Sequence, residues 1–77
     1  MTKIPEVIQL AKARAMARNG EAQAIRERNH LTISEVAREI EVSPSSVMRW
    51  EKGERSPRGD SAIRFAELMH KLDKVAP

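Results

Sequence analysis

Apolar residues recur along this chain at spacings of three and four, which place their side chains on one face of a helix. No stretch alternates apolar and polar residues as a half-buried strand does, and good helix formers such as alanine, leucine, glutamate and arginine dominate. The pattern therefore predicts an all-α fold, a compact bundle of four to five short helices with an additional helix at the N-terminus.

The first predicted helix begins with Pro5, where a missing N–H is tolerated, and continues to about Arg18. Asn19 and Gly20 end it because both residues suit a left-handed cap, and a second helix is expected over residues 21–29. We expect the apolar stripe of the first helix to pack on its own domain, between two protomers or on a separate protein. The stripe consists of Ile4, Val7, Ile8, Ala11 and Ala15. Alternatively, the cations of this segment follow the DNA backbone, namely Lys3, Lys12, Arg14 and Arg18.

Two short helices in the middle of the chain carry clear start and stop signals. Thr32 and Glu35 form a T-x-x-E capping box at the start of the first of them. Ser43 caps the second, Pro44 takes its first position, and Gly53 ends it. Because only about three residues connect them, the two helices must cross steeply and form a helix-turn-helix.

Trp50, the only tryptophan, lies in the most basic stretch of the sequence. It shares a helix face with Val47, three residues earlier, and this spacing favours a place in the core over a role as a ligand platform. The opposite face then projects hydroxyls and cations into solvent. That outward face carries Ser45, Met48, Arg49 and Lys52.

The last predicted helix opens at Gly59-Asp60-Ser61. Its apolar residues exceed what one helix face of a small monomer needs, so they either cover the core or form a dimer interface. These residues are Ile63, Phe65, Ala66, Leu68, Met69 and Leu72.

The composition excludes several classes of protein. Seventy-seven residues make one small domain without room for a deep substrate cavity. The chain has no cysteine, and His30 and His70 lie far apart without a carboxylate cluster, so no metal site is expected. Because it also lacks an activated nucleophile and a glycine-rich phosphate loop, we expect neither enzymatic activity nor a cofactor.

The net charge of +3 suits nucleic acid as well as an ordinary solvated surface, so the placement of the cations matters more than their number. Arg49, Lys52, Arg55 and Arg58 recur at every third position. No apolar run is long enough to cross a membrane, and the N-terminus lacks the pattern of a signal peptide. We therefore expect a cytoplasmic protein of a bacterial cell or a phage-infected host.

The sequence LTISEVAREIEVSPSSVMRWEKGERSP, residues 31–57, resembles the helix-turn-helix of the phage repressor and Cro family, also called the XRE family. Ile25 and Arg26 stand at the usual positions of the first family helix, so the resemblance covers residues 21–72. It implies four or five helices that bind double-stranded DNA, with the second helix of the motif in the major groove. The residues that match the family pattern are Leu31, Thr32, Val36, Ala37, Val42, Ser43, Val47, Trp50, Glu51, Gly53 and Pro57.

The resemblance also sets the expected domain boundaries. We expect an N-terminal helical extension over residues 1–19, a DNA-binding domain over residues 20–73 and a C-terminal tail over residues 74–77. The sequence departs from the family at Ile33, where glutamine is frequent, and at Glu41, where the turn usually has glycine. Ile33 weakens a polar contact or lies near a thymine methyl group. A left-handed conformation costs a non-glycine residue about 1–2 kcal/mol, so Glu41 predicts a differently shaped turn.

Side-chain chemistry at the matched positions predicts contacts with DNA. Arg49 is expected to make bidentate hydrogen bonds to guanine, with a phosphate contact or solvation as alternatives, while Ser45 faces a base edge and Pro44 a thymine methyl group. The resemblance further implies a partly buried ion pair between Arg26 and Glu51, which makes both of them scaffold residues. The expected phosphate contacts are Thr32, Ser43, Ser46, Lys52, Arg55 and Arg58.

These features predict a sequence-specific transcription regulator, a small repressor of phage or bacterial type that reads DNA with the helix over residues 44–52. The alternative is an antitoxin, because residues 50–69 are similar to the W-E-x-G-x-x-x-P-x-G region of HigA-like antitoxins, which bind DNA and a toxin protein. The N-terminal helix would then hold the toxin. The family often dimerises through its C-terminal helix, and the N-terminal helix is a second candidate for a homodimer interface.

Overall fold

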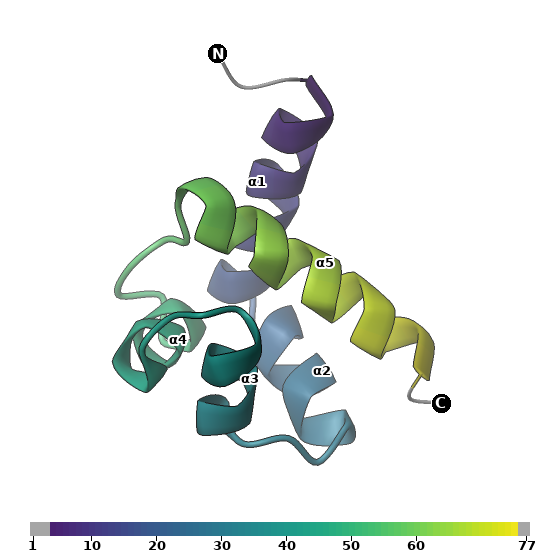
Figure 1. The fold of residues 1–77 in the computed structure, drawn as a ribbon, viewed down its shortest axis with the longest axis vertical. Helices are drawn as coiled ribbons and strands as arrows, with labels where there is room; N and C mark the ends of the chain where they lie inside the picture. The colour runs from purple at the N-terminus through teal and green to yellow at the C-terminus, as the bar shows by residue number, and fades with distance from the viewer. Residues whose placement is uncertain (1–3, 76–77) are drawn as a thin grey trace.

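The computed structural model describes residues 4–75 as five helices with no strand among them (Figure 1). This architecture confirms the predicted all-α fold. Residues 1–3 of the expected N-terminal extension and residues 76–77 of the expected tail lie outside the described range. The helices are α1 (Ile4–Arg18), α2 (Glu21–Arg28), α3 (Ile33–Glu39), α4 (Pro44–Glu51) and α5 (Gly59–Val75).

The turn between α3 and α4 keeps a left-handed residue although it contains no glycine. Glu41 has φ +60°, its N–H donates to the Arg38 carbonyl, and the Val42 N–H donates to the Ala37 carbonyl over 3.0 Å. These two bonds form a Schellman motif, which satisfies carbonyls at the end of α3. The expectation of a differently shaped turn is therefore wrong, because the two bonds offset the local cost of placing glutamate there.

The predicted capping box at the start of α3 is confirmed. The Thr32 hydroxyl accepts a hydrogen bond from the Glu35 N–H over 3.0 Å, and the Glu35 carboxylate accepts one from the Thr32 N–H over 2.9 Å. The backbone bond from Thr32, followed by the bond to its side chain, lowers the pKa of Glu35 below its ordinary value of 4.5. The stability that the Glu35 carboxylate contributes is therefore fully present at a pH above its ordinary pKa, and it is lost as the pH falls through the lowered pKa.

The variant Thr32→Ala is expected to lower the stability of the fold by about 1 kcal/mol at neutral pH, because the Glu35 N–H loses its acceptor. In a domain of this size the melting temperature should fall by roughly 4–8 °C. Thermal denaturation followed by circular dichroism measures the change. Ser34→Ala, which removes an exposed hydroxyl from the same turn of α3, is the matched control and should stay close to wild type. Equal melting temperatures for the two variants would contradict the role of the cap.

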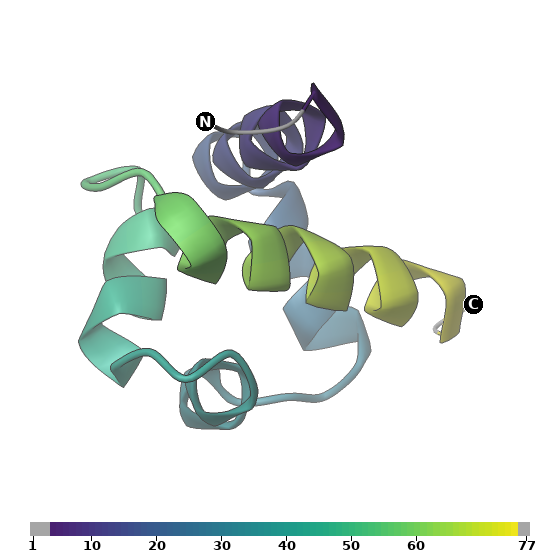
Figure 2. The ribbon, with the colours of Figure 1, turned by 45° about the horizontal axis from the view of Figure 1, so that its top comes forward.

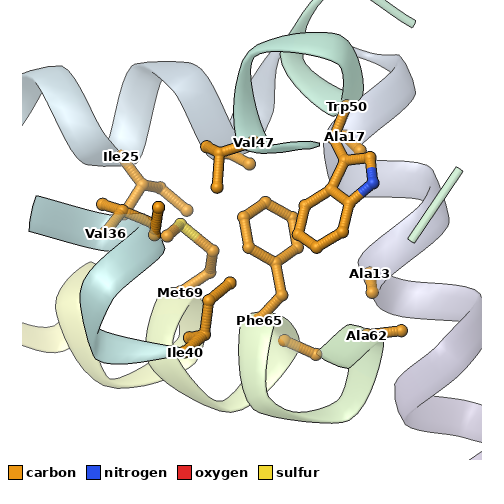
Figure 3. Packing of buried hydrophobic residues seen from close by; sticks show 13 residues of the cluster. Ala13, Ala17, Ile25, Val36, Ile40, Val47, Trp50, Ala62, Phe65 and Met69 are labelled. Carbon is orange, nitrogen blue, oxygen red and sulfur yellow. The ribbon is translucent and has the colours of Figure 1, made fainter. Parts of the chain in front are cut away.

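The core lies where all five helices meet (Figure 3). Trp50 is only 6% exposed, and its ring packs edge-on against Phe65 with the ring centroids 5.1 Å apart. Val47, one turn before Trp50, is fully buried. These contacts fix one face of α4 against α5 and leave the other face toward solvent. The remaining large buried side chains are Ile25, Val36, Ile40, Pro57 and Met69.

α1 packs through a different face from the one that the sequence pattern predicts. Ile4, Val7 and Ile8 are 78%, 50% and 51% exposed, so the predicted stripe does not pack on the described part of its own domain. Ala13 and Ala17 are buried instead, and Figure 3 shows both of them turned toward the core. Leu10 and Met16 of α1 are partly buried against the same core, and Ala13 and Ala17 let the helix backbones approach closely. Figure 2 shows that α5 lies between α1 and α3.

Candidate nucleic-acid interface

α3 and α4 form a compact helix-turn-helix in which α4 is capped at both ends. The Ser43 hydroxyl accepts a hydrogen bond from the Ser46 N–H over 3.2 Å, and Pro44 follows at the first helical position. At the other end Gly53 has φ +74°, and its N–H donates to the Trp50 carbonyl over 3.1 Å. α4 is therefore a short helix with a defined start and end.

The outward face of α4 brings together the residues for which we predict base contacts. Pro44, Ser45 and Arg49 are all exposed, as are Met48 and Lys52 beside them. Within residues 4–75 the Arg49 guanidinium has no hydrogen bond or ion pair. It is therefore available to a ligand, although the Arg49 carbonyl is occupied by the turn that follows α4.

The residues with predicted phosphate contacts fall into two groups in the structure. The Thr32, Ser43 and Ser46 hydroxyls serve as helix-capping groups or their partners, since the Ser43 and Ser46 oxygens lie 2.9 Å apart and Thr32 completes the capping box. Each hydroxyl keeps capacity for a further hydrogen bond. The cationic group consists of Lys52, Arg55 and Arg58, which are exposed and without an ion pair among the described residues.

A polar groove lies beside α4, between that helix, the loop after it and the first turn of α5. We call it the α4–α5 groove. It brings Ser46, Arg55 and Arg58 together with Trp50, and Glu54 contributes a carboxylate to its lining. Ser61 was not singled out by the sequence, and the only signal for it is its place in the first turn of the last helix. The residues that line the groove are Val42, Ser46, Trp50, Glu54, Arg55, Ser56, Arg58 and Ser61.

Arg26 and Glu51 form a bidentate ion pair between α2 and α4. Arg26 Nε lies 2.7 Å from Glu51 Oε2, Arg26 Nη2 lies 2.9 Å from Oε1, and the two side chains are 12% and 6% exposed. Arg26 Nη1 also donates to the Leu31 carbonyl over 2.9 Å. The hydrogen bond to Glu51 is the main reason that the pKa of Arg26 is raised. The pair joins α2 to α4 and to the turn before α3, so it serves as scaffold.

Ile33 is not fully exposed to solvent, unlike the residues on the outward side of α4. It is partly buried and packs against the hydrophobic core. The residue that departs from the family pattern therefore adds apolar contact at the first turn of α3, and any contribution to a DNA contact is limited to its exposed part.

The described residues contain no group of three or more His, Cys, Asp or Glu side chains that could hold a metal ion. None of the described helices is both long enough and apolar enough to span a membrane.

The sequence pattern of the helix-turn-helix family matches residues 23–72, about two thirds of the chain, from α2 to the last turn of α5. α1 precedes the matched region. Neither the curated proteins nor the solved structures contain a match to the chain. The capped α3–α4 motif and the exposed Arg49 of α4 fit this match. Because the match covers more than half of the chain, it shows that the chain belongs to the helix-turn-helix family of phage repressor and Cro type, whose members are DNA-binding regulators.

Proposed function

We propose that this protein is a sequence-specific transcription regulator, a small repressor of phage or bacterial type. α4 would enter the major groove, where base edges carry a distinct pattern of donors and acceptors. The observation that carries the proposal is the outward face of α4, on which Ser45, Arg49 and Lys52 are exposed while Val47 and Trp50 anchor the opposite face in the core.

Within this proposal the residues of α4 have different roles. Arg49 has an unpaired guanidinium in the middle of the exposed face, so it is suited to two parallel hydrogen bonds with guanine. Ser45 lies one turn earlier and faces a neighbouring base edge, and Pro44 contacts a thymine methyl group. Lys52, at the end of the helix, together with Arg55 holds the DNA backbone.

The variants Arg49→Ala and Lys52→Ala test this division. Loss of Arg49 should relax discrimination at one base position by about 1–3 kcal/mol, whereas loss of Lys52 should weaken binding to all sequences alike. Binding to a set of duplexes that differ at single positions, measured at constant salt, separates the two effects. If both variants lose the same affinity for every duplex, the assignment of base readout to Arg49 is wrong.

A homodimer would explain how so small a domain reaches useful specificity. In a two-fold dimer the two copies of α4 read half-sites roughly 34 Å apart, which gives a palindromic site. The exposed apolar side chains of Ile4, Val7 and Ile8 favour α1 as the dimer surface. On α5 the large apolar residues Phe65 and Met69 are buried in the core, which leaves less of that helix for a partner.

The same exposed face of α1 favours a second candidate function, that of an antitoxin. A cavity of about 340 Å³ between α1, α2 and α5 shares Ala15 with the apolar stripe of α1, and its lining includes Met16 and His70. A toxin protein held there would leave α4 free for DNA. Purification of the chain in a defined complex with a small basic ribonuclease, whose activity it suppresses, would support this function. Suppression that survives the change of Val7 and Ile8 to serine would contradict the role of α1.

A further inference from the structure

We propose that Trp50, whose ring belongs to the core, also donates its indole N–H to a phosphate group of the DNA backbone in the α4–α5 groove. This inference rests on the proposed function. It gives Trp50 a role in DNA binding in addition to the core position that the sequence predicts.

The first support is the indole N–H itself. Only 6% of Trp50 is exposed, yet its indole N–H has no hydrogen-bond acceptor among residues 4–75. Every fully buried side-chain N or O atom of the described residues has a hydrogen-bond partner. Because the indole nitrogen has none, it is not fully buried and keeps contact with solvent. Figure 3 shows it on the side of the ring that faces away from Phe65. A polar donor held at the edge of a core, without a partner in the chain, is suited to a ligand.

The second support is the set of groups around that donor. The α4–α5 groove places the Ser46 and Ser61 hydroxyls and the cations Arg55 and Arg58 next to Trp50. A tetrahedral phosphate has acceptor oxygens for several such donors at once, and hydrogen bonds to an ionised acceptor are the strong ones. Glu54 is the one carboxylate in the lining, so the cations outnumber it.

The start of α5 adds further donors at the same place. The Asp60 and Ser61 N–H groups lie in the first helical turn and make no hydrogen bond within the described chain. Unpaired N–H groups at a helix N-terminus attract anions, and the helix dipole acts in the same direction. The Asp60 carboxylate is exposed in this turn and opposes the attraction. The proposal therefore depends on Trp50 and the two arginines rather than on the helix terminus.

The position of the groove suits a backbone phosphate better than a base. Ser46 and Trp50 lie four residues apart on one flank of α4, next to the outward face that carries Arg49. A helix in the major groove reads bases with its outward face, while the phosphates of the flanking strand lie beside it. The indole would then fix the depth at which α4 enters the major groove of the DNA.

Because the chain has a single tryptophan, one indole ¹⁵N–¹H resonance reports on this donor directly. We expect the resonance of the wild-type protein to move downfield when a short mixed-sequence duplex is added at low salt, since non-specific binding already engages phosphates. Sodium phosphate, compared with sodium chloride at equal ionic strength, should move it in the same direction but less. A resonance that moves with inorganic phosphate and not with the duplex would overturn the assignment to DNA.

The failures of the two proposals give different spectra. If backbone amide resonances of α4 move on addition of the duplex while the indole resonance stays in place, the inference about Trp50 is wrong and DNA binding stands. If no resonance moves, the proposed function fails and the inference fails with it.

The variant Trp50→Phe keeps an aromatic ring against Phe65 and removes the N–H. We expect it to bind duplexes about tenfold more weakly, because a hydrogen bond to a charged acceptor is lost. Its salt dependence should equal that of wild type, because the indole neutralises no charge. Arg55→Gln should instead reduce the log–log salt slope by about 0.9. Affinities are compared below the melting temperature of each variant. Wild-type affinity for a folded Trp50→Phe protein would overturn the inference.

Discussion

Replacement of Glu51 by alanine should destabilise the fold by about 3–5 kcal/mol, because it leaves the Arg26 guanidinium without its charged partner. Both oxygens of Glu51 accept hydrogen bonds from Arg26, over 2.7 and 2.9 Å, and neither side chain is more than 12% exposed. The remaining partners of Arg26 would be the Leu31 carbonyl and the more distant Glu27. Urea denaturation followed by circular dichroism measures the loss.

Glu27→Ala is the matched control for this prediction. Glu27 approaches the same guanidinium, at 3.8 Å, but its side chain is 58% exposed. Exposed pairs contribute at most about 1 kcal/mol, so this variant should remain close to wild type. We further expect Glu51→Ala to lose DNA binding only through unfolding, with affinity recovered under conditions that keep the variant folded. Unchanged stability of Glu51→Ala would refute the scaffold role of the pair.

The second large effect is expected at Phe65. The variant Phe65→Ala should lose about 3–5 kcal/mol of stability, since truncation of a fully buried phenylalanine leaves a cavity as well as lost transfer energy. Phe65 is 1% exposed and packs edge-on against Trp50 at 5.1 Å. Its loss therefore removes the support of the residue that anchors α4. Urea denaturation at constant temperature gives the change in unfolding free energy.

Ile8→Ala is the control for Phe65→Ala, because it also truncates a large apolar side chain but on the exposed face of α1. Its effect should stay within about 0.5 kcal/mol of wild type in the monomer. If Ile8→Ala loses much more stability than this, and the stability of the wild-type protein rises with protein concentration, α1 is covered by a second copy. A mild loss at Phe65 would show that the core collapses around the missing ring.

The parts of the fold that sequence predicted well are those set by local chemistry. The capping box of Thr32 and Glu35 and the cap of Ser43 depend on residues within four positions of one another, so their pattern is visible in the chain. The same is true of the burial of Val47 and Trp50 on one face of α4.

The features that the sequence left open or predicted wrongly depend on tertiary contacts. On α1 the large residues Ile4 and Val7 outrank alanine in any hydrophobic pattern, but the fully buried residues of this helix are Ala13 and Ala17. At Glu41 the pattern indicated strain without showing that the Schellman bonds would still form. The local sequence shows neither how closely two helices approach nor whether such hydrogen bonds offset the cost of a left-handed residue.

The candidate interface shows the same division. Arg49 and Lys52 follow from helical spacing, so their exposure on one face was predictable. Ser61 enters the α4–α5 groove from a separate helix, and only the packing of α5 against the rest of the domain brings it near Ser46. Periodicity placed Trp50 in the core but gave no sign of where its N–H would lie.

The central claim, that α4 reads DNA sequence, is tested most directly by selecting bound duplexes from a random library near physiological salt. We expect enrichment of one site, with two-fold symmetric half-sites spaced by about one helical turn if the protein acts as a dimer. A single unsymmetrical site would support base readout by a monomer. The absence of any enriched sequence, with only weak binding that disappears as salt is raised, would contradict the claim.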